Sequence, residues 1–172
     1  DTIELAYSGA QIIHPKTIKP LQNKNIPLYV RPFGDKTKPG TVIGGDAKHV
    51  SMPIMILKRD QVFLVIRSRE FSFVMEEQFG EIFSMLERFR IKTNLIHNSA
   101  VDLNLCTESS WRLEEAAAAL QAEGFDTTIN NDVELLTIRN HTEQSLKAHT
   151  FSERNIVKQI DARTVRVILR KE

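Results

Sequence analysis

The run Gln61-Val62-Phe63-Leu64-Val65-Ile66-Arg67 decides the fold class of this chain. It is rich in β-branched and aromatic residues, and its apolar side chains are continuous, which is typical of a largely buried strand. Downstream of it, apolar residues recur mostly at steps of three and four: Met75, Phe79, Ile82, Phe83, Leu86 and Phe89. This spacing predicts a helix with one broad apolar face. The chain therefore begins an α+β unit with a buried strand and an amphipathic helix.

Four further elements continue this unit. Thr93–Asn98 and Ala100–Cys106 have the composition of two strands separated by a tight turn. A helix is expected over Trp111–Ala122, with Ser110 as its N-cap. A strand near Thr127–Asn130 follows. The order strand, helix, strand, strand, helix, strand is the βαββαβ order of the ferredoxin-like fold.

The same order begins again after residue 131. Val133–Arg139 is expected to be a strand, Thr142–His149 a short helix, and Asn155–Ile160 and Thr164–Arg170 a pair of strands. The basic segment Arg163–Lys171 is interpreted as a solvated edge strand, because charged residues discourage edge-to-edge association. The second unit lacks the final helix and strand of the first. We therefore expect two small α+β modules packed together, the second one shortened.

The first 47 residues form a separate block. Pro15 marks the first turn of a helix, which is expected to end by Asn23–Asn25. Leu28–Arg31 and Thr41–Ile43 have the composition of short strands, and Gly44-Gly45-Asp46 is interpreted as a flexible joint. The block has too few apolar residues for a core of its own, so we expect it to pack on other structure.

Composition excludes several classes of partner. With 41% hydrophobic and 26% charged residues, the 172-residue chain is typical of a globular protein. A formal net charge of +1 favours neither nucleic acid nor an anionic membrane. The single cysteine, Cys106, cannot form an internal disulfide, which indicates a reducing, cytoplasmic location. No apolar run approaches the roughly 20 residues that span a bilayer.

Three phrases near the start of the chain carry a family resemblance: Leu5-Ala6-Tyr7-Ser8-Gly9-Ala10-Gln11-Ile12-Ile13-His14-Pro15-Lys16-Thr17, Asn25-Ile26-Pro27-Leu28-Tyr29-Val30 and Pro39-Gly40-Thr41-Val42-Ile43. In this order and spacing they resemble the end of the catalytic domain of aspartate kinases. A βαββαβ unit directly after such an ending is similar to the tandem ACT domains of that family, which are amino-acid-sensing modules. The resemblance implies a catalytic-domain remnant over residues 1–47, a first ACT domain over 52–131 and a truncated second ACT-like domain over 132–172.

The resemblance also implies an activity for the parent protein. Aspartate kinases transfer the γ-phosphoryl group of ATP to the β-carboxylate of L-aspartate, the first step toward lysine, threonine and methionine. Because this chain opens at Asp1 within a motif, we expect it to be a fragment. It lacks a glycine-rich loop from strand to helix that would cradle phosphates, so we expect no catalytic residue in it and no activity of the fragment alone.

An edge of the nucleotide site is implied at two residues. By resemblance Gln11 and Ile12 occupy positions that contact ATP in the family, where the first is usually Lys or Arg. An amide at Gln11 keeps hydrogen bonding but loses the attraction of a charge to phosphate. The alternative is that Gln11 is a solvated helix residue.

The effector site is implied between the loop after the first strand and the start of the second. By resemblance it contains five residues: Phe71, Gln78, Thr93, Asn94 and Ser99. Lysine-binding members have Asp where this chain has Asn94 and Glu where it has Ala100, and a desolvated lysine ammonium needs such carboxylates. The resemblance implies lysine or threonine as the ligand, and the loss of both carboxylates favours an amino acid with an uncharged side chain. It also implies a homodimer formed through the ACT domains. The alternative is a purely structural dimerisation module whose effector site has decayed.

Two other kinds of site are not expected. The histidines are scattered without metal-ligand spacing, and only one cysteine accompanies them, so no metal site is predicted. His14, which precedes Pro15 at a helix start, is expected to cap or pack. RNA-recognition modules share the ferredoxin-like order, but they need aromatic side chains exposed on the middle strands, and here Phe63 lies in a core run.

Overall fold

The computed structural model describes residues 13–44, 52–69, 76–149 and 153–171, and the chain divides into two units, Asp1–Met52 and Pro53–Glu172. In the first unit α2 (Pro15–Asn23) precedes β1 (Leu28–Val30), which pairs antiparallel with β2 (Thr41–Ile43). These elements confirm the predicted helix and strands.

Local contacts explain the ends of the elements in this first unit. The Nδ1 atom of His14 accepts a hydrogen bond from the backbone N–H of Lys16 at 3.1 Å, so His14 caps α2 as expected. Gly40 has φ +73°, and a Cβ atom there would lie 2.3 Å from the carbonyl oxygen of Val30, so only glycine is compatible. Within the described part of the unit Ile18 alone is a buried apolar residue, which agrees with the absence of a separate core.

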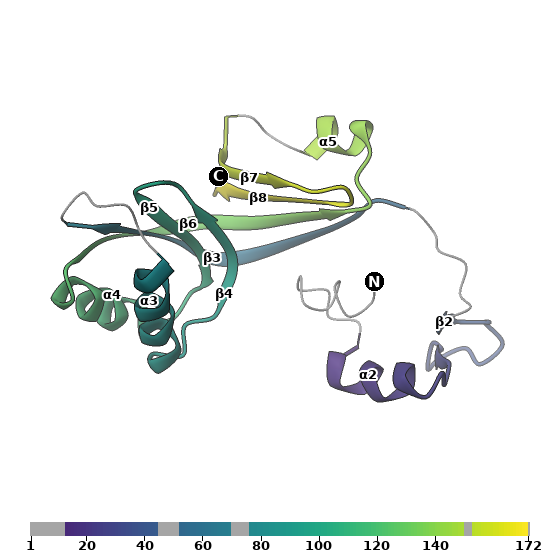
Figure 1. Ribbon diagram of the computed structural model, residues 1–172. Coiled ribbons are helices and arrows are strands. Elements are labelled where there is room, and N and C mark those ends of the chain that lie inside the picture. The colour runs from purple at the N-terminus through teal and green to yellow at the C-terminus, as the bar shows by residue number, and fades with distance from the viewer. Residues whose placement is uncertain (1–12, 45–51, 70–75, 150–152, 172) are drawn as a thin grey trace. The chain divides into compact units, whose positions relative to one another are not determined.

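Six strands form one antiparallel sheet in the second unit, in the order β4-β5-β3-β6-β8-β7 (Figure 1). The strands are β3 (Ile54–Ser68), β4 (Thr93–Asn98), β5 (Asp102–Glu108), β6 (Phe125–Arg139), β7 (Asn155–Ile160) and β8 (Thr164–Arg170). The helices are α3 (Glu76–Arg88), α4 (Leu113–Ala122) and α5 (Glu143–His149). The α+β class and the ferredoxin-like unit are confirmed.

The two longest strands, β3 and β6, run side by side through the whole sheet and divide it into two halves (Figure 1). The first half-sheet contains β4, β5, Gln61–Ser68 of β3 and Phe125–Asn130 of β6. The second half-sheet contains Ile54–Lys58 of β3, Val133–Arg139 of β6, β8 and β7. Residues Ile54–Lys58, which precede the first ferredoxin-like unit, thus supply the fourth strand of the second half-sheet.

The strands predicted near Thr127–Asn130 and over Val133–Arg139 are one continuous strand, so the expected break between them is wrong. The division expected at residues 131 and 132 falls inside β6. The pairing of β3 with β6 changes register twice, between Lys58 and Gln61 and between Gln61 and Phe63. Asp60, within the first shift, has a positive φ of 53°. These bulges let both strands continue from one half-sheet into the other without a turn, because an extra residue bends a strand while its pairing continues.

The interpretation of Arg163–Lys171 as an edge strand is also wrong. Strand β8 lies between β6 and β7 and is paired on both sides. Ile168 is fully buried on the face opposite Val165 and Val167, so both faces of the strand contribute to the core. The arginine pattern concealed this position because only one face was read as apolar.

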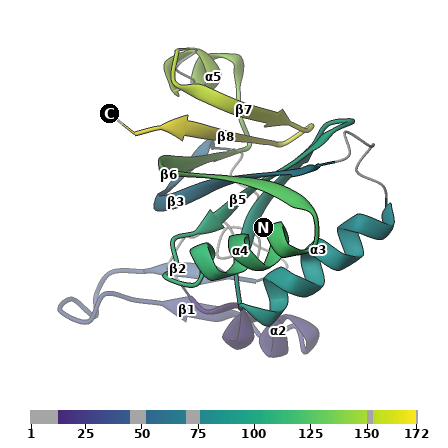
Figure 2. The ribbon, with the colours of Figure 1, turned by 90° about the vertical axis from the view of Figure 1, so that its left-hand side faces the viewer.

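All three helices cover the same face of the sheet. In the first half-sheet α3 and α4 lie together over Val62, Leu64 and Ile66 of β3 (Figure 2). In the second, Leu146 of α5 packs against the apolar cluster that contains Leu136 and other strand residues. The strand registers place both clusters on one face, because directly paired residues project to the same side.

The opposite face carries no helix among the described residues and is concave. Its apolar cluster joins both half-sheets: Phe63, Leu95, Cys106, Val133, Leu135, Val157 and Ile168. The edge strands β4 and β7 approach across it, since the side-chain amide of Gln159 donates to the carbonyl oxygen of Ile96 at 2.6 Å. The sheet therefore curls around this cluster, which we call the concave core.

Candidate effector site

The structure describes four of the seven predicted site residues. Gln11, Ile12 and Phe71 lie outside the described residues. Gln78 is in the first turn of α3, and Thr93 and Asn94 begin β4. Ser99 directly follows that strand.

Asn94 is buried, with 9% of its surface exposed, and both ends of its side-chain amide are bonded. Its Oδ1 accepts from the ammonium group of Lys58 at 2.9 Å, and its Nδ2 donates to Oε1 of Gln61 at 2.7 Å. The Gln61 amide in turn donates to the carbonyl oxygen of Arg59 at 3.0 Å. Asn94 therefore belongs to a polar network beside the concave core.

Two ammonium groups share one carboxylate in this network. Oε1 of Glu108 lies 2.7 Å from Nζ of Lys92 and 3.8 Å from Nζ of Lys58. Burial lowers the pKa of Lys58, Lys92 lowers it further, and Glu108 acts in the opposite direction. Burial also raises the pKa of the Cys106 thiol to about 12, which keeps it protonated at neutral pH.

Ser99 shapes the turn between β4 and β5. Its hydroxyl oxygen accepts from the backbone N–H groups of Asp102 at 3.0 Å and Val101 at 3.3 Å. Asn94 and Ser99 are separated by most of β4, which at about 3.3 Å per residue amounts to roughly 16 Å. One chain therefore does not bring these two predicted residues together around a single amino acid.

Gln78 presents an unsatisfied acceptor at the beginning of α3. Its Oε1 atom is buried, and no hydrogen-bond donor reaches it from the described residues. A buried acceptor without a donor costs about 1–3 kcal/mol, so such an atom is a natural place for a ligand or a second chain to donate.

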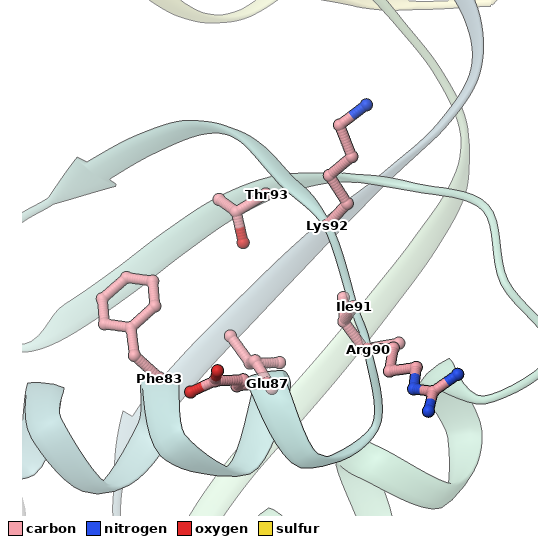
Figure 3. Close-up of a pocket in the computed structure, with 7 residues that line it drawn as sticks. Phe83, Glu87, Arg90, Ile91, Lys92 and Thr93 are labelled. Carbon is pink, nitrogen blue, oxygen red and sulfur yellow. The ribbon is translucent and has the colours of Figure 1, made fainter. Parts of the chain in front are cut away.

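A pocket of about 470 Å³ lies between the end of α3 and the start of β4 (Figure 3). Phe83, Glu87 and Thr93 converge on it, whereas Arg90 and Lys92 point away. Apolar walls with one carboxylate and one hydroxyl suit a small amphipathic molecule.

Sequence reasoning selected Thr93, which lines the pocket, but missed Phe83 and Glu87 beside it. It also missed Lys58, which donates a hydrogen bond to Asn94. The helical period assigns Phe83 to an apolar face, yet it cannot show that this face extends past the edge strand. Lys58 follows the apolar run Ile54–Leu57, and a lysine at the end of such a run was the only signal of its burial.

Comparison with known proteins identifies the relatives of this chain. No protein-family model matches it. Chloroplastic aspartokinase 3 of Arabidopsis thaliana is 33% identical over 115 residues, which is 64% of this chain and 20% of that protein. The lysine-sensitive aspartokinase 3 of Escherichia coli is 27% identical over 112 residues, 64% of this chain and 24% of that protein. This chain is a relative of the aspartokinases. It spans only about a fifth of the length of the curated aspartokinases it matches.

Solved aspartokinase structures have the same fold. Escherichia coli aspartokinase III in complex with aspartate and ADP superposes with a TM-score of 0.75 at 19% identity, covering 98% of this chain and 41% of that chain. A putative C-terminal regulatory domain of aspartate kinase from Porphyromonas gingivalis gives 0.56 at 14% identity, covering 70% and 88%. The second unit of this aspartokinase relative therefore has the fold of aspartokinase regulatory domains.

The described residues contain neither a membrane-spanning helix nor a metal centre. No helix in the described ranges combines the length and apolarity needed to cross a membrane. Nor do the described side chains of His, Cys, Asp and Glu assemble into a group of three or more that could hold a metal ion.

Proposed function

We propose that this chain is the amino-acid-sensing, dimerising regulatory region of an aspartate kinase. The observation that carries the proposal is the position of the predicted effector residues at opposite ends of the edge strand β4. If β4 pairs antiparallel with β4 of a second copy, the start of one strand lies beside the end of the other. Thr93 of one copy would then approach Ser99 and the start of α3 of the other.

Three features support a site between two copies. The unsatisfied Oε1 of Gln78, buried in the first turn of α3, would accept from the ammonium group of a bound amino acid once its side chain turns toward the new interface. The pocket beside Thr93 adds apolar surface, from Phe83, Leu86 and Ile91, next to this interface. Ile96, 48% exposed on the edge strand β4, would be covered by the second copy, whose strand would displace the Gln159 amide from the Ile96 carbonyl oxygen.

The division into domains is part of this proposal. Residues 1–47 would be a remnant of the catalytic domain, 52–131 the first ACT domain and 132–172 the second ACT-like domain. The pairing of Ile54–Lys58 with β6 suggests that the second domain borrows its fourth strand from the chain before the first.

The parent enzyme would use ATP to phosphorylate L-aspartate in the cytoplasm, with Gln11 and Ile12 contacting the nucleotide. The sequence holds no glycine-rich phosphate-binding loop, so this chain alone should form no aspartyl phosphate from ATP and aspartate. Trapping acyl phosphate with hydroxylamine tests this: activity of the chain alone would contradict its proposed regulatory role.

Calorimetry of the full chain against lysine, threonine and methionine tests the sensing function. We expect heat from at least one amino acid at micromolar to millimolar concentration, and loss of that heat when the dimer is broken. Ile96→Lys should break the dimer in sedimentation experiments. Ile160→Lys, on the exposed surface of the other edge strand, β7, is the matched control and should not.

A structural dimerisation module is the second candidate. The hydrogen bonds of Asn94 favour it, because both ends of this side-chain amide are bonded to Lys58 and Gln61 of the same chain and not to a ligand. A stable dimer with no heat for any of the three amino acids would establish this candidate.

A further inference from the structure

The network beside Asn94 contains a cation that belongs to the chain itself. The Lys58 side chain is only 15% exposed, and its ammonium group donates to Oδ1 of Asn94 at 2.9 Å. The two residues are 36 positions apart in sequence, on β3 and β4. Such an ammonium group occupies the position that the side chain of a cationic amino acid would need in order to reach Asn94.

The charge of the network also opposes a second cation. Lys58 and Lys92 lie within 4 Å of one carboxylate oxygen of Glu108, at 3.8 and 2.7 Å. Two ammonium groups and one carboxylate leave a local excess of one positive charge. Like charges disfavour one another strongly when partly buried, because water screens them less there.

Displacement of Lys58 by a ligand would not relieve this opposition. The ammonium group of a bound ligand at Asn94 would leave the Lys58 ammonium group without its hydrogen bond to Asn94 in a mostly buried position, which is unfavourable. An uncharged or anionic side chain makes no such demand.

We propose that Lys58 determines the specificity of the effector site: its ammonium group fills the polar position at Asn94 and excludes amino acids with a cationic side chain. The inference rests on the proposed sensing function and deepens it. The effector class becomes amino acids with an uncharged or acidic side chain, and Lys58 acts through Asn94 as a positioning residue.

Calorimetry of the full chain with lysine, threonine and methionine tests the inference. The wild-type chain should bind lysine at least tenfold more weakly than its preferred amino acid. Lys58→Met keeps the apolar stem and removes the charge, and it should bind lysine at least tenfold more tightly than the wild type. The matched control is Arg59→Met, which removes a neighbouring positive charge outside the network and should change lysine affinity less than threefold. If Lys58→Met does not fold, Lys58→Gln, which keeps a donor for Asn94, serves the same purpose.

A second measurement does not depend on any ligand. In the wild-type chain an amine-acylating reagent should modify Lys58 at least tenfold more slowly than Lys92, whose side chain is 59% exposed. Asn94→Ala should remove most of that protection. Equal rates for the two lysines in the wild type would overturn the inference.

The outcomes separate the inference from the proposed function. Binding of threonine or methionine without any gain of lysine affinity in Lys58→Met or Lys58→Gln overturns the inference and leaves amino-acid sensing intact. Tight lysine binding by the wild type does the same. Silence of every variant toward every amino acid overturns the sensing function, and the inference with it.

Discussion

The two half-sheets begin with the same order of elements but bury their helices very differently. In the first half-sheet α4 buries Leu113, Ala116, Ala117 and Leu120 against the strands. In the second, α5 has seven residues and buries none of them. Met55 and Leu57 project to the helix face, as their partners Ile138 and Leu136 do, yet remain 48% and 44% exposed. A repeated order of elements does not imply equal stability of the repeats.

The two half-sheets are therefore stabilised in different ways. The first half-sheet has a core of its own between helices and strands. The second depends on β3 and β6, which continue into it from the first, and on the concave core that both share. We therefore expect the second half-sheet to open more readily, since local stability follows the amount of buried apolar contact.

The largest expected effect tests the helices of the two halves. Leu120→Ala, at a fully buried position of α4, should lower the free energy of unfolding by about 2–5 kcal/mol because it leaves a cavity. Leu146→Ala on the partly exposed α5 should cost about 1 kcal/mol or less. Urea denaturation of both variants checks the ranking, and equal losses would refute the contrast.

A smaller effect concerns the turn that delivers α4 to β6. Gly124 has φ +93°, a conformation that side chains disfavour, although a Cβ atom would meet nothing within 4 Å. Gly124→Ala should therefore lower stability by about 1–2 kcal/mol through backbone strain alone. Gly80→Ala, inside α3 with equally open space, should instead raise it by up to about 1 kcal/mol. If backbone conformation is the cause, the melting temperature should fall in Gly124→Ala and rise in Gly80→Ala, relative to the wild type.

The concave core links the halves and should make stability depend on pH. The folded pKa of Cys106, about 12, lies above the ordinary thiol value, so the buried thiol contributes stability below about pH 8.5 that is lost as pH rises. Relative to Cys106→Ala, the wild-type chain should lose about 1 kcal/mol between pH 7.5 and 9.5. Urea midpoints of both proteins across this range measure the loss; a constant difference between them would contradict it.

The smallest effect is expected at the rim of the first half-sheet. Arg67 pairs with Asp102 across β3 and β5, and its side chain is 60% exposed. Arg67→Ala should lower the free energy of unfolding by less than about 1 kcal/mol, because exposed ion pairs are screened. Repeating the urea titration in 1 M salt is the control, since the difference should shrink there. A loss above 2 kcal/mol would mean that the rim matters as much as the core.

Local patterns were sufficient for most individual elements. The bounds predicted for β4, β7 and β8 agree with the structure, and the amphipathic spacing located α3. Ser110 was expected to cap α4, but its hydroxyl accepts from Arg112 one turn earlier, and the helix begins at Leu113. These features depend on neighbours in sequence, which is why sequence patterns reveal them.

The candidate site was predicted less well. The resemblance selected Asn94 and Ser99, but it could not show that they lie at opposite ends of one strand, or that Lys58 already bonds Asn94. Neither fact has a periodic signature. Both depend on which strands become neighbours.

The sequence by itself determined the class of the fold, the order of its elements and the aspartokinase kinship. Tertiary structure alone decided that Ile54–Lys58 completes the second half-sheet, that β8 is internal and that Lys58 meets Asn94. The physical reason is that hydrophobic period reports the face on which a side chain lies, whereas strand partnership arises from packing between segments distant along the chain.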